Sequence, residues 1–289
     1  MLPVSSTIAM LPDGYQRLLA SARERLEGDE LVRAMWLGGS VARGTADAAS
    51  DLDVILAVAD DAHAAFAGAW REWLADITPT VLAEALPFAP GSFYSVTPAF
   101  ERFDVVVEPV SATPTTFFRS RVVVFDKDGL DATVPPPEPG PGPSADAVRA
   151  LITEYFRVAA VETILVRDDW LLAREHLHLV ASLIYRLFVE ANAPLPPMGV
   201  KQWSTKLTPD QRAALAALPT TAGDVRELGA AHSAAAAVFV TNAEALAREL
   251  GVDWPHELEA AAARHMGAAL SLDEPYPRGP RAVVGAAAR

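Results

Sequence analysis

The chain has 289 residues, which is enough for two domains, and 51% of them are hydrophobic, as in globular proteins. The formal net charge is −13, and no run of Lys or Arg occurs. This argues against nucleic acid as a partner, because proteins that hold this polyanion usually carry a basic patch. Since the chain has no cysteine, disulfides, thiolate zinc sites and cysteine nucleophiles are excluded.

The N-terminal residues lack the basic start and the long apolar run of a signal peptide. No stretch of the sequence is long and apolar enough to predict a membrane span. We therefore expect a cytoplasmic protein that does not associate with a membrane. The acidic surface either favours solubility or attracts a cationic small molecule, and composition leaves both interpretations open.

The first half of the chain mixes helical and strand-like segments. Apolar periodicity predicts helices over residues 16–26 and 62–77. Short apolar runs predict strands at residues 31–37, 52–58, 92–96, 103–107 and 121–125. Strands mixed with helices are typical of an α/β domain, which we place at residues 1–133.

A proline-rich segment separates this half from a helical one. Residues 134–144 begin with VPPPEPGPGP, and proline fixes φ and removes backbone donors, so we predict an extended linker. The later chain has helical periodicity at residues 145–166, 168–191, 209–218, 222–250 and 254–270. This pattern predicts an all-helical domain over residues 145–271. Residues 272–289 have little periodicity and are predicted to be a flexible tail.

The most informative stretch joins a strand ending at Leu37 to a Gly-Ser turn and then to two aspartates. Gly39 lets the backbone approach a ligand closely, and the Ser40 hydroxyl adds a hydrogen-bond donor. If a helix starts at this turn, its free N–H groups face an incoming phosphate. Asp51 and Asp53 follow in an apolar strand, where alternation makes both carboxylates project from the same face.

These carboxylates indicate a metal site. Two carboxylates at short range repel each other unless a cation lies between them, and Mg²⁺ takes oxygen ligands that it shares with substrate phosphates. Asp104 is the one charged residue of a later apolar run, FDVVV. If the two strands are neighbours, Asp104 either binds a second metal ion or accepts the proton of an attacking hydroxyl. The structural alternative is that Gly-Ser turns and aspartates near strand ends are common.

The segment GGSVARGTADAASDLDVIL, residues 38–56, resembles the signature of the polymerase-β-like nucleotidyltransferase superfamily, in which Gly-Ser is followed by Asp-x-Asp. The resemblance implies an α/β (α+β) domain with a mixed sheet, where Gly39 and Ser40 hold the triphosphate of ATP. Arg43, in an Ala-Arg-Gly step, either contacts phosphate or packs the loop. The resemblance also implies two Mg²⁺ ions held by three carboxylates, those of Asp51, Asp53 and Asp104.

The helical half resembles the C-terminal bundle of the streptomycin and spectinomycin adenylyltransferases. The segment PLPPMGVKQWSTKLTPDQ is similar to a part of that bundle where a lysine reaches the nucleotide phosphates. Lys201 matches this lysine by spacing, and Lys206 is the reserve candidate. Those enzymes carry glutamate as their third carboxylate, where this chain has Asp104.

An acidic and aromatic group lies at the junction of the two long predicted helices. It comprises Asp168, Asp169, Trp170 and Glu175. Such a group is able to bind a cationic sugar by charge and stacking. The structural alternative is a helix start, because aspartate near a helix N-terminus interacts favourably with the helix dipole.

We therefore expect a Mg²⁺-dependent nucleotidyltransferase that moves a nucleoside monophosphate, AMP from ATP, onto a hydroxyl of a small molecule. An aminoglycoside-like antibiotic is the leading candidate for this acceptor. One alternative is a protein adenylyltransferase of the minimal-nucleotidyltransferase antitoxin type, which shares the Ala-Arg-Gly loop. Another alternative is a non-catalytic nucleotide-binding module with the same fold.

Overall fold

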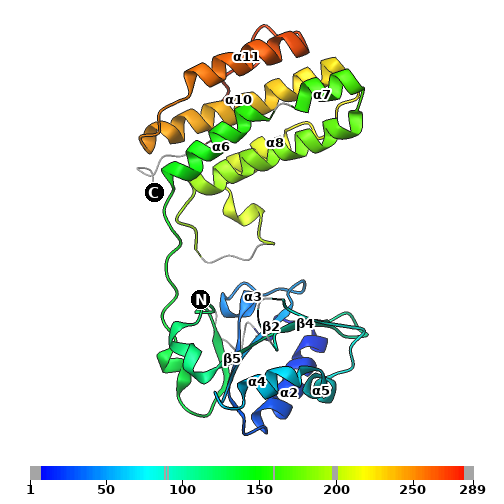
Figure 1. Cartoon of the computed structure of the whole chain (residues 1–289), viewed down its shortest axis with the longest axis vertical. Helices are drawn as coiled ribbons and strands as arrows, with labels where there is room; N and C mark the ends of the chain where they lie inside the picture. The colour runs from blue at the N-terminus through cyan, green and yellow to red at the C-terminus, as the bar shows by residue number, and fades with distance from the viewer. Residues whose placement is uncertain (1–7, 88, 90, 159, 197–200, 283–289) are drawn as a thin grey trace. The chain divides into compact units, whose positions relative to one another are not determined.

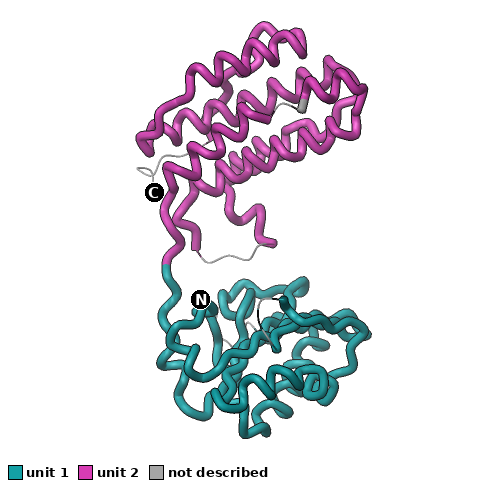
Figure 2. The backbone as a smooth tube through the Cα atoms, viewed as in Figure 1, with its two compact units in different colours: residues 1–138, 197–199 teal, residues 139–196, 200–289 magenta. Residues whose placement is uncertain are grey.

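The computed structural model describes residues 8–282 except residues 88, 90, 159 and 197–200. The chain divides into two compact units (Figure 2), one of residues 1–138 and 197–199, the other of residues 139–196 and 200–289. These are the N-terminal unit and the helical unit. Of the helices that the structure describes, none has both the length and the apolar character that a membrane span requires.

A six-stranded sheet forms the centre of the N-terminal unit, with the strand order β3-β4-β5-β2-β1-β6. β2 and β5 are parallel, whereas the other neighbours are antiparallel, so the sheet is mixed as predicted. The strands are β1 (Val32–Leu37), β2 (Leu52–Val58), β3 (Leu82–Ala85), β4 (Phe93–Val96), β5 (Arg102–Pro109) and β6 (Val122–Asp126). The sequence analysis missed β3, because its four residues are mostly exposed at a sheet edge and carry no apolar pattern.

Helices cover one face of the sheet (Figure 1). Alternate residues of the central strands, such as Val54 and Leu56, share a hydrophobic core with these helices. They are α2 (Asp13–Glu27), α4 (His63–Gly68) and α5 (Trp70–Ile77). The single helix predicted over residues 62–77 is therefore two helices, α4 and α5.

The other face of the sheet has a smaller cover of irregular chain. Trp36 and Ile55 form a second cluster there, against which Phe118 and Leu130 pack. The cover includes the 3-10 helices η1 (Val110–Thr115) and η2 (Leu130–Thr133). This thinner cover leaves room for a site on the second face.

The helical unit surrounds one hydrophobic core of its own. Its helices are α6 (Ala145–Arg157), α7 (Ala160–Arg167), α8 (Trp170–Ala191), α9 (Pro209–Ala216), α10 (Val225–Glu249) and α11 (His256–Leu270), with a 3-10 turn η3 (Ser204–Lys206). The helix predicted over residues 145–166 is divided between α6 and α7. The predicted fold class, an α/β domain with a mixed sheet followed by an all-helical domain, is confirmed.

The segment after α11 differs from the predicted flexible tail. Tyr276 is 6% exposed and belongs to the core of the helical unit. Arg278 forms ion pairs with Glu244 at 2.9 Å and Glu259 at 2.6 Å. One buried aromatic ring and one bridging guanidinium fix this segment without any periodicity in the sequence. The end of the predicted tail, residues 283–289, lies outside the described residues.

Candidate active site

A glycine turn at the end of β1 contacts β2, the strand that carries Asp53. The N–H of Gly38 donates a hydrogen bond of 2.9 Å to the carbonyl of Asp53. Gly39 has φ +55°, and a Cβ at this position would lie 1.6 Å from Oδ2 of Asp53. Glycine is therefore required on two grounds, since the backbone is left-handed and the aspartate occupies the space of a side chain.

The helix that follows this turn is short. α3 (Gly39–Ala42) comprises a single turn of four residues. A single turn sums few peptide dipoles and attracts an anion only weakly. The contact of its free N–H groups with a phosphate stays a prediction.

Two buried polar atoms beside the turn have no hydrogen-bond partner among the described residues. They are the Oγ of Ser40 and the Nε of Arg43. Buried side-chain donors in folded proteins are nearly always hydrogen-bonded, so both atoms are candidates to donate to a ligand. This finding favours phosphate contact for Arg43 over a purely packing role.

Asp53 and Asp104 are direct neighbours across β2 and β5. The two strands are parallel, and these residues are partners in the register. Flanking residues such as Val54 and Val105 face the helix-covered core, so both aspartates project from the opposite face. Both are half-buried. The sequence analysis required that the two strands be neighbours, and the structure meets this condition.

Asp51 lies just before β2, where its carboxylate is 3.4 Å from the guanidinium of Arg102. Arg102 also donates a 2.8 Å hydrogen bond to the carbonyl of Ala49. Within the described part of the chain, no three His, Asp or Glu side chains already converge in a group able to hold a metal ion. Metal binding by the three aspartates would therefore include a rearrangement of side chains, with the guanidinium exchanging for the cation at Asp51.

A cavity of about 560 Å³ opens beside the glycine turn. Gly38, Gly39, Arg43 and Ile55 line one part of it, and residues 115–120 with Pro137 and Glu138 line the rest. The sequence analysis missed the 115–120 segment. No motif marks it, and only the pairing of β6 with β1 brings it to this position.

Arg121 fixes the 115–120 segment through hydrogen bonds. Its side chain is 1% exposed, and its guanidinium donates to the Thr116 hydroxyl at 2.7 Å and to the Phe118 carbonyl at 2.6 Å. The guanidinium lies 4.6 Å from the ring centre of Trp36. Burial lowers the pKa of Arg121, while Glu108 at 3.3 Å acts in the opposite direction.

Residues 17–88 match the family model of the nucleotidyltransferase domain. The N-terminal unit is a nucleotidyltransferase domain. The matched range includes the glycine turn and the first two aspartates, and it ends before Asp104. The predicted superfamily and the predicted class of enzyme, a nucleotidyltransferase, are confirmed at this level.

The comparison with solved structures finds a distant likeness for the whole chain. An aminoglycoside 6-adenyltransferase from Bacillus subtilis has a TM-score of 0.43 and 15% sequence identity, covering 88% of this chain and 96% of that chain. A likeness at this level does not bear on what this chain acts on. No curated protein matches the sequence.

The acidic and aromatic group predicted to bind substrate lies around the start of α8, outside the nucleotidyltransferase domain. Asp169 caps this helix by accepting a 3.0 Å hydrogen bond from the N–H of Leu172. Asp168 accepts a 2.6 Å hydrogen bond from the indole of Trp170. These three residues therefore have structural roles at the helix start, as in the alternative interpretation.

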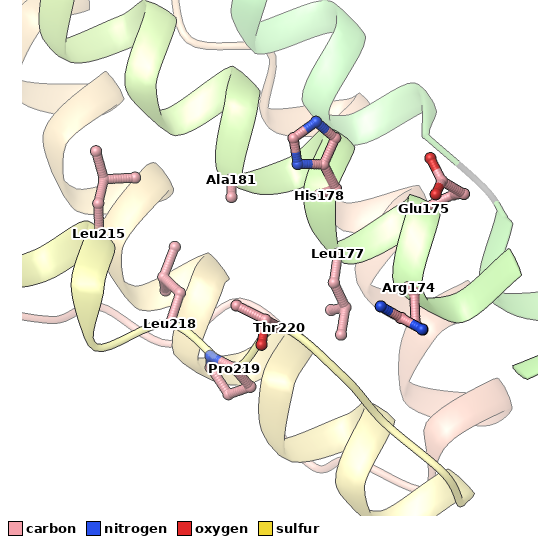
Figure 3. A pocket seen from close by; sticks show the side chains of 9 residues that line it. All are labelled: Arg174, Glu175, Leu177, His178, Ala181, Leu215, Leu218, Pro219 and Thr220. Carbon is pink, nitrogen blue, oxygen red and sulfur yellow. The ribbon is translucent and has the colours of Figure 1, made fainter. Parts of the chain in front are cut away.

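Glu175 is placed differently, because it lines a cavity of about 470 Å³ within the helical unit (Figure 3). Arg174 and His178 from the same helix also line it, and Leu218 to Thr220 form another part of its wall. The cavity combines charged groups with apolar surface, which is the character of a small-molecule site.

Lys201 is exposed and belongs to the helical unit. Close behind it, the ring of Trp203 stacks on Tyr185, with centres 4.1 Å apart and planes at 17°. The reserve candidate Lys206 lies in η3, where its carbonyl accepts a 2.8 Å hydrogen bond from Asn192. The stack and this hydrogen bond hold the segment that carries both lysines.

Proposed function

We propose that this chain is a Mg²⁺-dependent nucleotidyltransferase that transfers AMP from ATP to a hydroxyl of a small, cationic acceptor. The observation that carries the proposal is the register of Asp53 with Asp104 beside the Gly39 turn. Two carboxylates on one exposed sheet face, next to unpartnered donors, are suited to a metal-bound triphosphate.

The donor set fits magnesium. Carboxylate oxygens are its preferred protein ligands, and Asp51, Asp53 and Asp104 would hold two such ions. When bound, the metal would polarise the α-phosphate and neutralise charge on the pyrophosphate leaving group. At Asp51 the cation would take the place of the Arg102 guanidinium, which lies 3.4 Å from the carboxylate.

The chain's own residues would bind and orient the donor. The Ser40 hydroxyl and the Arg43 guanidinium have free buried donor atoms for phosphate oxygens. Lys201 would add a mobile positive charge to the β- and γ-phosphates. Gly39 keeps the turn close to Asp53, so that phosphate and carboxylate share one cation.

Asp104 is also the candidate general base, as the alternative to its role as a metal ligand. Its carboxylate would accept the proton of the acceptor hydroxyl while that oxygen forms a bond to the α-phosphorus. The bond from the α-phosphorus to the bridging oxygen of the β-phosphate breaks, and pyrophosphate leaves. Asp53, its neighbour in the register, would serve as a metal ligand.

The acceptor class rests on charge. The chain carries a net charge of −13, and such a field draws cations to the surface. Glu175 supplies a carboxylate at the wall of the helical unit's cavity, where an amino sugar of aminoglycoside type would find an ionic partner. The sequence resemblance to the streptomycin and spectinomycin adenylyltransferases makes this class the first to test.

The test measures pyrophosphate release from MgATP with a panel of aminoglycosides. We expect release with at least one member, and we expect Asp53→Asn to reduce the rate by about 1,000-fold or more, because a metal ligand is lost. Asp61→Asn is the matched control, since Asp61 is exposed beyond the opposite end of β2, and its rate should not change.

Three results would count against the proposal. Full activity of the Asp53→Asn variant would exclude the metal role of this residue. Pyrophosphate release only with a protein acceptor would transfer the assignment to the protein adenylyltransferase alternative. Tight ATP binding without turnover on any acceptor would favour the non-catalytic alternative.

A further inference from the structure

The cavity beside the glycine turn has a second wall that the family motif does not include. β6 pairs antiparallel with β1, and Leu37 is the register partner of Val122. The segment that precedes β6 therefore lies at the same sheet edge as the turn that follows β1. Residues 115–120 thus line the same cavity as Arg43.

An unpartnered donor lies in the lining of this cavity. The Nε of Arg43 is buried without a partner among the described residues, and Arg43 lines the cavity. Guanidinium N–H groups donate only, so a ligand that satisfies this atom must present acceptor oxygens.

Hydrogen bonds hold the second wall in place. Arg121 binds both Thr116 and the carbonyl of Phe118, which holds the backbone of this segment in one arrangement. The hydroxyls of Thr115 and Thr116 already donate, to the Ala112 carbonyl at 3.3 Å and to Glu108 at 2.5 Å. A preformed wall loses little conformational entropy when a ligand binds.

Arg119 already binds an oxyanion at the rim of this cavity. Its guanidinium donates to the carboxylate of Glu138, which also lines the cavity. The Glu138 side chain is 75% exposed, so this ion pair is weak and exchangeable. A polyphosphate carries more charge than a carboxylate and accepts bidentate hydrogen bonds from arginine.

We propose that residues 115–121 form the second wall of the donor's polyphosphate site, with Arg119 as the ligand of the terminal phosphates and Glu138 as its exchangeable partner. This inference rests on the proposed function, because it takes the Gly39–Arg43 turn as the first wall. Arg43 and Arg119 then both hold the β- and γ-phosphates. Arg121 is a positioning residue that keeps the wall in place.

The test is calorimetric titration of the full chain with MgATP, AMP and inorganic tripolyphosphate. Arg119→Gln should weaken the binding of MgATP and tripolyphosphate about tenfold, the usual effect of losing one charge-assisted hydrogen-bonding partner, and should leave AMP unchanged. Glu138→Gln should strengthen the binding of both polyphosphates several-fold, because Arg119 no longer needs to exchange a carboxylate. A purely structural role would not give effects of opposite sign.

Arg149→Gln is the matched control, since Arg149 is an exposed arginine of the helical unit that is also paired with a carboxylate, Asp146. Its affinities should equal those of the wild type. Unchanged polyphosphate affinity in both Arg119→Gln and Glu138→Gln, with MgATP bound by the wild type, would overturn this inference and leave the proposed function intact. Failure of the wild type to bind MgATP would instead overturn both.

Discussion

At the scale of single residues, Gly39 connects backbone geometry to catalysis. A Cβ on Gly39 would overlap the carboxylate of Asp53, and its φ of +55° is strained for any other residue. Gly129 has a similar φ of +73°, but no atom lies within 4 Å of the position of its Cβ. The pair separates the cost of backbone strain from the cost of displacing the aspartate.

We predict that Gly39→Ala and Gly129→Ala each lower the free energy of unfolding of their unit by about 1–2 kcal/mol, through left-handed strain. Only Gly39→Ala should also reduce nucleotidyl transfer, by about 100-fold or more, because Asp53 must move away from its metal-binding position. Urea denaturation and pyrophosphate release measure the two effects. Equal activity of the two variants would contradict a positioning role for Gly39.

The third carboxylate, Asp104, is recognisable in the sequence as the one charge in an apolar strand. Its proximity to Asp53 follows from the parallel pairing of β2 with β5. The ion pair of Asp51 with Arg102 was not foreseen, because Arg102 precedes the predicted strand and carries no motif. Local sequence patterns therefore identify the aspartates, whereas the residues that pair with them depend on tertiary contacts.

At the scale of elements, strands with strong apolar patterns were predicted well, whereas short edge strands were not. The prediction for residues 52–58 coincides with β2, since a buried central strand is almost entirely apolar. β3 and the 115–120 wall had no signal, because one is an exposed edge and the other gains its role only through the β1–β6 pairing. The ordered structure around Tyr276 was not predicted for the same reason, because single long-range contacts leave no periodic pattern in the sequence.

Two helices of the helical unit bury histidines that each have one ring nitrogen without a hydrogen-bond partner among the described residues. His176 on α8 and His232 on α10 are 4% and 7% exposed, and the Nδ1 of His176 and the Nε2 of His232 have no hydrogen-bond partner among the described residues. Burial lowers the pKa of each to about 4, from an ordinary value of 6.5. Both side chains are therefore neutral in the folded protein near pH 7.

The sign of the pH dependence follows from these values. Between pH 6.5 and about 4 the unfolded chain binds protons that the folded chain does not, so the stability that is complete above pH 6.5 is lost as the pH falls. Each histidine accounts for roughly 3 kcal/mol of this loss. We predict that His176→Leu makes the free energy of unfolding of the helical unit less dependent on pH between 6.5 and 4.

Urea denaturation at several pH values, followed by far-ultraviolet circular dichroism, measures this slope. His178→Leu is the control, because His178 is exposed two residues further along the same helix. It should keep the wild-type slope. A wild-type slope in His176→Leu would show that its neutral, buried state does not contribute to acid sensitivity.

At the scale of the whole molecule, the two units have separate hydrophobic cores. Among the residues that the structure describes, the core of the helical unit contains none from the N-terminal unit, and the two clusters of the N-terminal unit contain none from the helical unit. Residues 134–144, proline-rich and mostly without regular structure, connect them. Each unit therefore has the means to unfold as its own cooperative transition.

This organisation predicts two thermal transitions, and a ligand will raise only the transition of a unit that it binds. MgATP at 100 times its dissociation constant should stabilise the N-terminal unit by about 2.7 kcal/mol. If Lys201 contacts the donor, the transition of the helical unit should also rise, because Lys201 belongs to that unit. Differential scanning calorimetry with and without MgATP measures both shifts.

The rise of the helical transition should then disappear in Lys201→Gln, with Lys206→Gln as the control, while the N-terminal shift persists. A helical transition that MgATP leaves unchanged in the wild type would restrict donor binding to the N-terminal unit and remove Lys201 from the site.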